Sequence, residues 1–118
     1  MSRRDAAASL YEIVSACEEI AEIVGSLTAE EYAQQRVVQL AVERLLITCG
    51  EAVSRILRSQ SGQTEDWKTN PHAVVGLRNF ITHDYDRVDA SIVFAAAQSA
   101  AAELLEDARA SLARAESR

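Results

Sequence analysis

The sequence predicts an all-α protein, an up-and-down bundle of four main helices. Along most of the chain, apolar residues recur at steps of three and four, which is the period of a helix with one buried face. Only four glycines and one proline occur among 118 residues, and a sandwich or barrel of many short strands needs more turn residues than that. Because there is no internal repeat and no long linker, we expect residues 1–118 to form a single helical domain.

The first helix is expected to end near residue 24, and Gly25 is interpreted as its left-handed C-terminal cap. The apolar stripe that predicts this helix comprises Leu10, Ile13, Val14, Cys17, Ile20, Ala21 and Val24.

A capping box from Thr28 to Glu31 predicts the start of a second, long helix that runs to about Arg58. The middle of this helix is apolar nearly all round, which indicates burial on more than one side. In so small a domain we expect the second side to contact a partner subunit.

A polar segment around Trp67 is expected to be a loop, and Asn70-Pro71 then has the composition of a helix start. This third helix should reach about His83. After a polar turn, Asp89 is expected to cap the last helix, whose end should fray beyond about Leu112.

Composition excludes several classes of function. The formal net charge of −6 argues against binding duplex DNA through bulk charge, although a local basic pocket remains open. No apolar run reaches membrane-spanning length, and residues 1–5 lack the apolar core of a signal peptide. We therefore expect a cytoplasmic protein with neither DNA nor a membrane as partner.

The chain offers little for metal or cofactor chemistry. Cys17 and Cys49 are too few for a disulfide scaffold or a zinc site, and we interpret them as small buried apolar residues. The carboxylates do not cluster as in a two-metal site. We expect no metal and no cofactor.

One short segment gathers the side chains that could carry chemistry, namely residues 78–85. Asn79 and His83 are four residues apart and so share a helical face. Arg78 and His83 are five apart, which places them about 140° from each other around the axis. A long arginine and a helix that ends at His83 would still let both line one cleft.

This set suits the cleavage of an RNA phosphodiester. A guanidinium can hold two phosphate oxygens and stabilise negative charge in the transition state. A neutral imidazole can take the proton from a ribose 2′-hydroxyl, because its ordinary pKa lies near neutrality. Asp84 would orient the imidazole or stay solvated. No metal is needed for this chemistry.

A structural reading of the same residues stands beside the catalytic one. A histidine at a helix C-terminus interacts favourably with the helix dipole, and Arg78 would then pair with a carboxylate. From spacing alone this is the more frequent case. Glu51, which follows Gly50, interrupts an apolar stretch and is interpreted as a buried carboxylate paired with an arginine.

The motif Arg78, four residues, His83, one residue, Tyr85 resembles that of HepT-like proteins in the HEPN superfamily. The similarity extends to residues 40–52, with their Gly-Glu-Ala step, to Trp67, and to residues 88–94 at the start of the last helix. It covers about residues 8–110 in order.

The resemblance implies a symmetric homodimer of HEPN-like bundles whose two motifs face each other, which would bring Arg78 and His83 together across subunits. It further implies a metal-independent endoribonuclease, the toxin of a toxin–antitoxin pair. The antitoxin would be a small nucleotidyltransferase of the MntA kind that transfers AMP to Tyr85. By position, Arg78 and His83 are catalytic, and Asn79 and Asp84 support the site.

Two other functions stay open. In the first, the chain is a non-catalytic partner subunit of a nucleotidyltransferase, and the motif serves nucleotide binding or docking. In the second, it is a purely structural dimerisation bundle.

Overall fold

The computed structural model describes residues 3–83 and 88–117, and all of its regular structure within these ranges is helical. The elements are α1 (Arg3–Val24), α2 (Ala29–Ala33), α3 (Arg36–Ser59), α4 (Pro71–His83), α5 (Ala90–Ala95), the π-helical segment η1 (Ala96–Ala100) and α6 (Ala101–Glu116). Because η1 follows α5 and precedes α6 without a break, these three form one rod, so the bundle has four main helices, as predicted.

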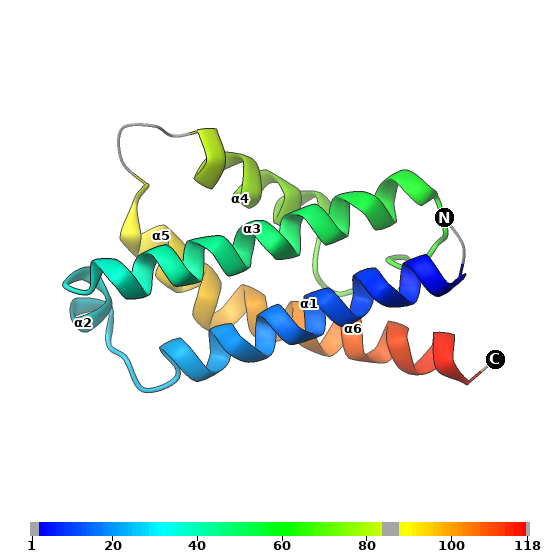
Figure 1. Ribbon diagram of the computed structural model, residues 1–118, viewed down its shortest axis with the longest axis horizontal. Helices are drawn as coiled ribbons and strands as arrows, with labels where there is room; N and C mark the ends of the chain where they lie inside the picture. Colours follow the sequence, from blue (N-terminus) through cyan, green and yellow to red (C-terminus); the bar gives the residue numbers. More distant parts are fainter. Residues whose placement is uncertain (1–2, 84–87, 118) are drawn as a thin grey trace.

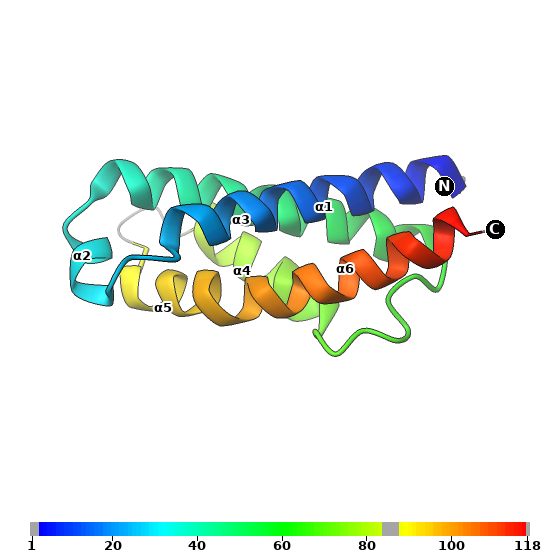
Figure 2. The same ribbon diagram turned by 90° about the horizontal axis from the view of Figure 1, so that it is seen from below.

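The helices lie in two layers. Helices α1 and α3 run side by side in one layer, and α4 and the rod ending in α6 form the other (Figures 1 and 2). Helix α1 packs against both α3 and α6, and α3 packs against α4. No helix in residues 3–83 or 88–117 is long and apolar enough to cross a lipid bilayer.

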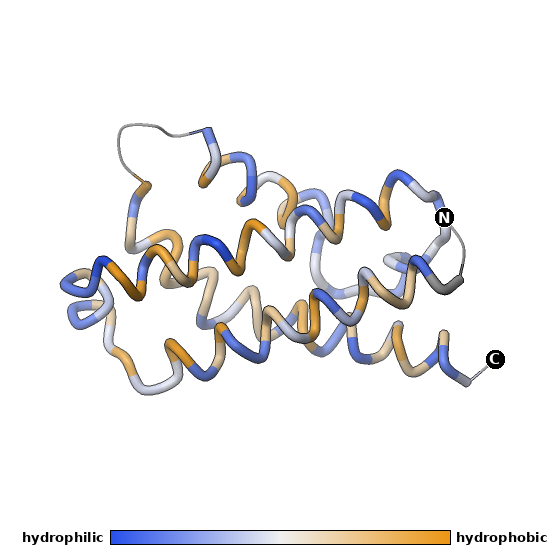
Figure 3. Tube along the Cα trace, in the orientation of Figure 1, coloured by the Kyte–Doolittle hydropathy of each residue, from blue (hydrophilic) through white to orange (hydrophobic). Residues whose placement is uncertain are grey.

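The core consists mainly of aliphatic side chains, and all four main helices contribute to it. Hydrophobic and hydrophilic positions alternate along each helix trace (Figure 3), as expected for helices with one buried face. Cys17 and Cys49 are both buried and free, with their Sγ atoms 3.8 Å apart. They therefore occupy the core as predicted. Fully buried side chains include Leu10, Ile13, Ile20, Tyr32, Val42, Val53, Ile56 and Val93.

The predicted helix from Thr28 to Arg58 is in fact two helices, so that prediction was wrong. The capping box is present, since Thr28 Oγ1 accepts from Glu31 N at 3.1 Å and Glu31 Oε1 accepts from Thr28 N at 2.9 Å. Helix α2 then ends after one turn, and Gln35 leaves the helical conformation with φ −119° and ψ 85°. The break lets Tyr32 lie 1% exposed against Phe94, with ring centroids 4.9 Å apart. Burial of this ring outweighs the local preference for one continuous helix.

Helix α1 ends at Val24 as predicted, but the predicted cap at Gly25 and the predicted end of the last helix were wrong. Gly25 does not adopt a positive φ; the left-handed cap is Gln60, with φ 53°, after α3. Helix α6 continues to Glu116 instead of fraying at Leu112, and Tyr11 of α1 donates a hydrogen bond of 2.5 Å to Glu116. This contact ties the last turn of α6 to α1.

The segment between α3 and α4 is fastened to α6 by buried polar groups. Trp67 Nε1 donates to Ser111 Oγ at 2.7 Å. The backbone N–H groups of Lys68 and Thr69 donate to the two carboxylate oxygens of Asp107 at 3.1 and 2.8 Å. Asp107 is 7% exposed, so these bonds lie largely out of water, where they are worth most. They determine where α4 begins.

Candidate functional site

Helix α4 carries three of the predicted site residues, and it begins at Pro71 as the sequence predicts. Asn70 Oδ1 accepts from His72 N at 2.9 Å, next to Pro71 in the first turn. At the other end Thr82 Oγ1 donates to the carbonyl of Arg78 at 3.0 Å. Because the helix is unbroken from Pro71 to His83, Arg78, Asn79 and His83 have fixed positions relative to one another.

Gly50 allows α4 to approach α3 unusually closely at Arg78. A Cβ atom placed on Gly50 would lie 2.3 Å from Arg78 Cβ and 2.8 Å from Arg78 Cγ. It would also lie 3.3 Å from the carbonyl oxygen of Val74. Any side chain at position 50 would push the two helices apart. Because glycine has no side chain, the stem of Arg78 can lie directly against α3.

The guanidinium of Arg78 is held loosely. Its Nη2 lies 3.7 Å from Glu51 Oε2, too long for a hydrogen bond, and its Nη1 donates to Asn79 Oδ1 at 2.8 Å. Its Nε is buried and has no hydrogen-bond partner among the described residues. The side chain as a whole is 34% exposed. The guanidinium thus retains donors that an incoming anion can use.

His83 is the last residue of α4 and is exposed, as is Asn79. The four-residue spacing puts Asn79 and His83 on the same side of the helix. The five-residue spacing leaves Arg78 and His83 about 140° apart around the axis. The structure therefore brings Arg78, Asn79 and Glu51 together, with His83 one turn further on. The predicted residues Asp84 and Tyr85 lie outside the described residues.

The prediction for Glu51 was right about its partner and wrong about its burial. It pairs with an arginine, Arg78, but its side chain is 42% exposed. The close approach at Gly50 was not predicted. A signal was available, because a glycine inside a helix is unfavourable and often marks a place where another backbone or side chain comes close.

Apolar side chains are exposed at the end of the bundle where α4 finishes. Val37 is 80% exposed and Leu40 50% exposed near the start of α3, and Ile92 of α5 is 50% exposed. The start of α3, α5 and the end of α4 lie at the same end of the molecule (Figure 1). In the described ranges, no three histidine, cysteine or acidic side chains gather as metal ligands would.

Comparison with known proteins gives concordant results. The family described as Ribonuclease HepT-like matches residues 13–110. A protein of Methanocaldococcus jannaschii with the name "Putative RNase" is 32% identical over 92 residues, which cover 75% of this chain and 80% of that protein. A second "Putative RNase" of the same organism is 30% identical over 93 residues, covering 75% of each chain.

Proposed function

The chain belongs to the ribonuclease HepT-like family, and from this premise we propose that it is a cytoplasmic, metal-independent endoribonuclease that acts as a toxin. Arg78 and His83 are its catalytic residues. Asn79 and Asp84 support them. The observation that carries the proposal is the loosely paired, partly exposed guanidinium of Arg78. Its stem is positioned by the contact with Gly50, and the same helix carries the exposed His83.

The chemistry follows from these groups. The guanidinium of Arg78 binds the non-bridging oxygens of the scissile phosphate and stabilises the charge that develops on them. Neutral His83 takes the proton of the ribose 2′-hydroxyl, and the 2′-oxygen attacks phosphorus. The bond from phosphorus to the 5′-oxygen breaks, and that oxygen takes up a proton. The products are a 2′,3′-cyclic phosphate and a 5′-hydroxyl end.

The proposed active form is a symmetric homodimer. Within one chain Arg78 and His83 project from different sides of α4, about 140° apart. A second copy lets the arginine of one subunit act with the histidine of the other. The exposed apolar residues Val37, Leu40 and Ile92 support this proposal, since apolar side chains gathered at one end of a bundle are typical of an interface.

Regulation by a nucleotidyltransferase antitoxin of the MntA kind is part of the proposal. In the proposed reaction the phenol oxygen of Tyr85 attacks the α-phosphorus of ATP, pyrophosphate leaves, and AMP stays attached through a phosphodiester. The added phosphate would carry negative charge next to the catalytic groups, where it competes with the RNA phosphate. Support for this step comes from the family's motif, which this chain matches at position 85.

Expression of the variants in a bacterial host tests the catalytic proposal. The wild-type chain is expected to arrest growth when produced alone, whereas Arg78→Ala and His83→Ala at equal protein levels are not. Equal toxicity of all three proteins would refute catalysis by these residues. Growth unaffected by the wild type, together with intact RNA after incubation with the pure protein, would favour the non-catalytic partner subunit.

Mixed dimers test whether the site is shared between subunits. Co-expression of Arg78→Ala with His83→Ala gives heterodimers in which one subunit supplies an intact arginine and the other an intact histidine. We expect these heterodimers to recover cleavage, with each single variant as the inactive control. Heterodimers as inactive as the single variants would contradict a composite site.

A further inference from the structure

Positive charge in this acidic protein is concentrated on α3 and α4. These two helices carry five arginines and two glutamates, whereas α1 and α6 together carry nine carboxylates and four arginines. The chain as a whole has a net charge of −6. The side of the bundle that holds Arg78 thus differs in sign from the rest.

Arg44 and Arg58 lie on the outward face of α3, on either side of the Arg78 site. Each is seven residues from Glu51, the ion-pair partner of Arg78. Seven residues are almost two full turns, so the three side chains share one face at intervals of about 10 Å along the axis. Arg44 and Arg58 are both exposed. The order along this face is therefore Arg44, the Glu51–Arg78 pair, and Arg58.

Neither of these two arginines forms an ion pair with a residue that the structure describes. Arg58 Nη1 donates to Ser54 Oγ at 2.9 Å, a neutral partner on its own helix. By contrast, Arg36 pairs with Glu43, Arg55 with Glu12, and Arg109 with Glu18. Arg44 and Arg58 thus keep their charge available on the side of Arg78.

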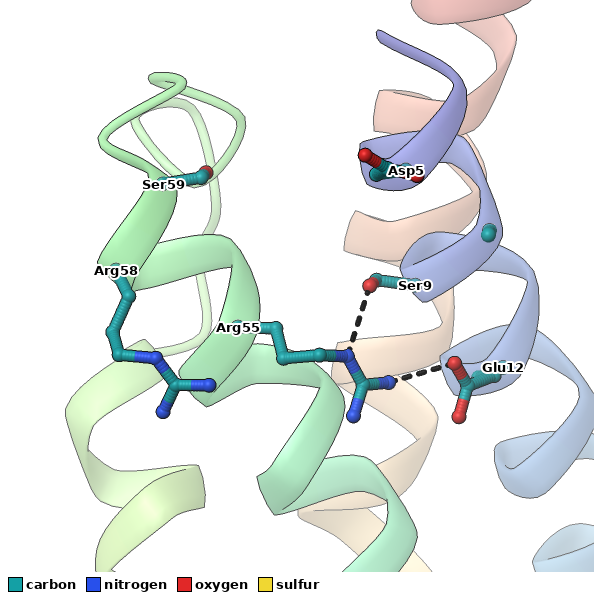
Figure 4. Close-up of a pocket in the computed structure, with 7 residues that line it drawn as sticks. Asp5, Ser9, Glu12, Arg55, Arg58 and Ser59 are labelled. Carbon is teal, nitrogen blue, oxygen red and sulfur yellow. Dashed lines mark hydrogen bonds and ion pairs between the residues drawn. The ribbon is translucent and has the colours of Figure 1, made fainter. Parts of the chain in front are cut away.

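Arg55, the remaining arginine of α3, is already occupied. It reaches across to α1, where its guanidinium donates to Ser9 Oγ at 3.3 Å and Glu12 Oε2 at 2.7 Å. Figure 4 shows Arg58 on the side of Arg55 away from Glu12. The cleft beside them has a volume of about 530 Å³ but is also lined by Asp5 and Glu12. It is not an anion site of its own, and the free charge lies on the outward face.

We propose that Arg44 and Arg58 contact the phosphates of single-stranded RNA on the two sides of the scissile phosphate. A strand that crosses Arg78 along the axis of α3 meets one arginine within a few nucleotides in each direction. Such contacts read no sequence; they hold the strand in register over the site. This proposal rests on the proposed ribonuclease function, since the strand must pass Arg78.

Salt-dependent binding of a fluorescein-labelled oligouridylate tests the proposal. The parent protein is His83→Ala, in which cleavage is blocked. Arg44→Gln and Arg58→Gln are added singly and together, and Arg109→Gln is the matched control because it removes the same charge from α6. Each contact with a single strand contributes about 0.7 to the slope of log K against log salt. The double variant is expected to bind several-fold more weakly, with a slope less steep by about 1.4, and the control is expected to bind like the parent.

Cleavage by the otherwise wild-type protein, measured in parallel, separates the two proposals. Unchanged binding by the double variant would overturn the role of Arg44 and Arg58, and so would a parent protein that does not bind the oligonucleotide. If the wild type cleaves RNA in either case, the proposed function stands without these contacts. If the double variant loses binding as expected while the wild type cleaves nothing, the two arginines bind RNA, but the ribonuclease function fails and no phosphate between them is scissile. Circular dichroism checks that each variant is folded.

Discussion

The close approach of α4 to α3 at Gly50 predicts that Gly50→Ala both destabilises the protein and misplaces Arg78. The added Cβ would lie 2.3 Å from Arg78 Cβ, whereas carbon atoms in contact are normally about 3.5–4.0 Å apart. The helices must separate locally by more than about 1 Å. Overpacking of this kind costs about 1–3 kcal/mol, and the better helix propensity of alanine returns at most about 1 kcal/mol. We expect a net loss of up to about 2 kcal/mol.

Urea unfolding, monitored by circular dichroism, measures the loss of stability. The rate of RNA cleavage reports the displacement of Arg78. A shift of about 1 Å in a catalytic group lowers the rate by about 100-fold. Gly76→Ala is the matched control, because a Cβ at Gly76 of α4 meets no atom within 4 Å. It should stabilise the protein by about 0.5–1 kcal/mol. Equal stability and equal activity of the two variants would show that the close contact at Gly50 does not position Arg78.

Two further predictions concern buried polar groups. Tyr32→Phe should stabilise the protein by about 1 kcal/mol, because the Tyr32 hydroxyl is buried without a hydrogen-bond partner among the described residues. Burial raises the pKa of Tyr32 from 10.0 to about 12. The negative charge of Glu43 adds to this increase, and the positive charge of Arg36 partly opposes it. The folded state therefore favours the neutral phenol, so the stability of the wild type should fall as the pH rises from 10 to 12, and the stability advantage of Tyr32→Phe should widen over this range. Urea titrations at several pH values check this. A stability difference between the two proteins that stays constant with pH would contradict it. Asp107→Ala should cost about 2–3 kcal/mol, because it leaves the N–H groups of Lys68 and Thr69 without their acceptor. The control is Glu106→Ala, at the exposed neighbouring position, which should change stability by less than about 0.5 kcal/mol. Similar unfolding midpoints for both variants would rule out the anchoring role of Asp107.

Local signals in the sequence predicted the helices that they govern. The apolar stripe of α1, the Asn70-Pro71 start of α4 and the cap at Asp89 all depend on neighbours within one or two turns. The structure has each of them, and Asp89 Oδ1 accepts from Ser91 N at 2.9 Å. The hydrogen bonds that Asp89 accepts from the side chain and then the backbone of Ser91 hold the pKa of Asp89 below its ordinary value. Interactions of such short range can be predicted from residue spacing alone.

Features that depend on distant residues were not predicted. The break between α2 and α3 contains neither proline nor glycine, and its cause is the packing of Tyr32 on Phe94, which is 62 positions further along the chain. The π-helical segment η1 lies in a run of alanines that gives no sign of it. The anchoring of Lys68 and Thr69 by Asp107 likewise depends on a contact between segments nearly 40 residues apart.

The candidate site divides in the same way. Arg78, Asn79 and His83 were predicted from their spacing and from the resemblance, and the structure places them on one helix. The partner of Glu51 was predicted only as an arginine, because nothing local shows which arginine reaches it. The role of Gly50 depends on how two helices pack, and spacing along one helix does not contain that information.

Metal-independent catalysis by Arg78 and His83 is tested by cleavage of RNA with the purified protein in buffer containing EDTA. We expect the wild type to produce fragments with 2′,3′-cyclic phosphate and 5′-hydroxyl ends, and Arg78→Ala and His83→Ala to leave the RNA intact. Fragments of the same kind and amount from all three proteins, or intact RNA from the wild type, would contradict it.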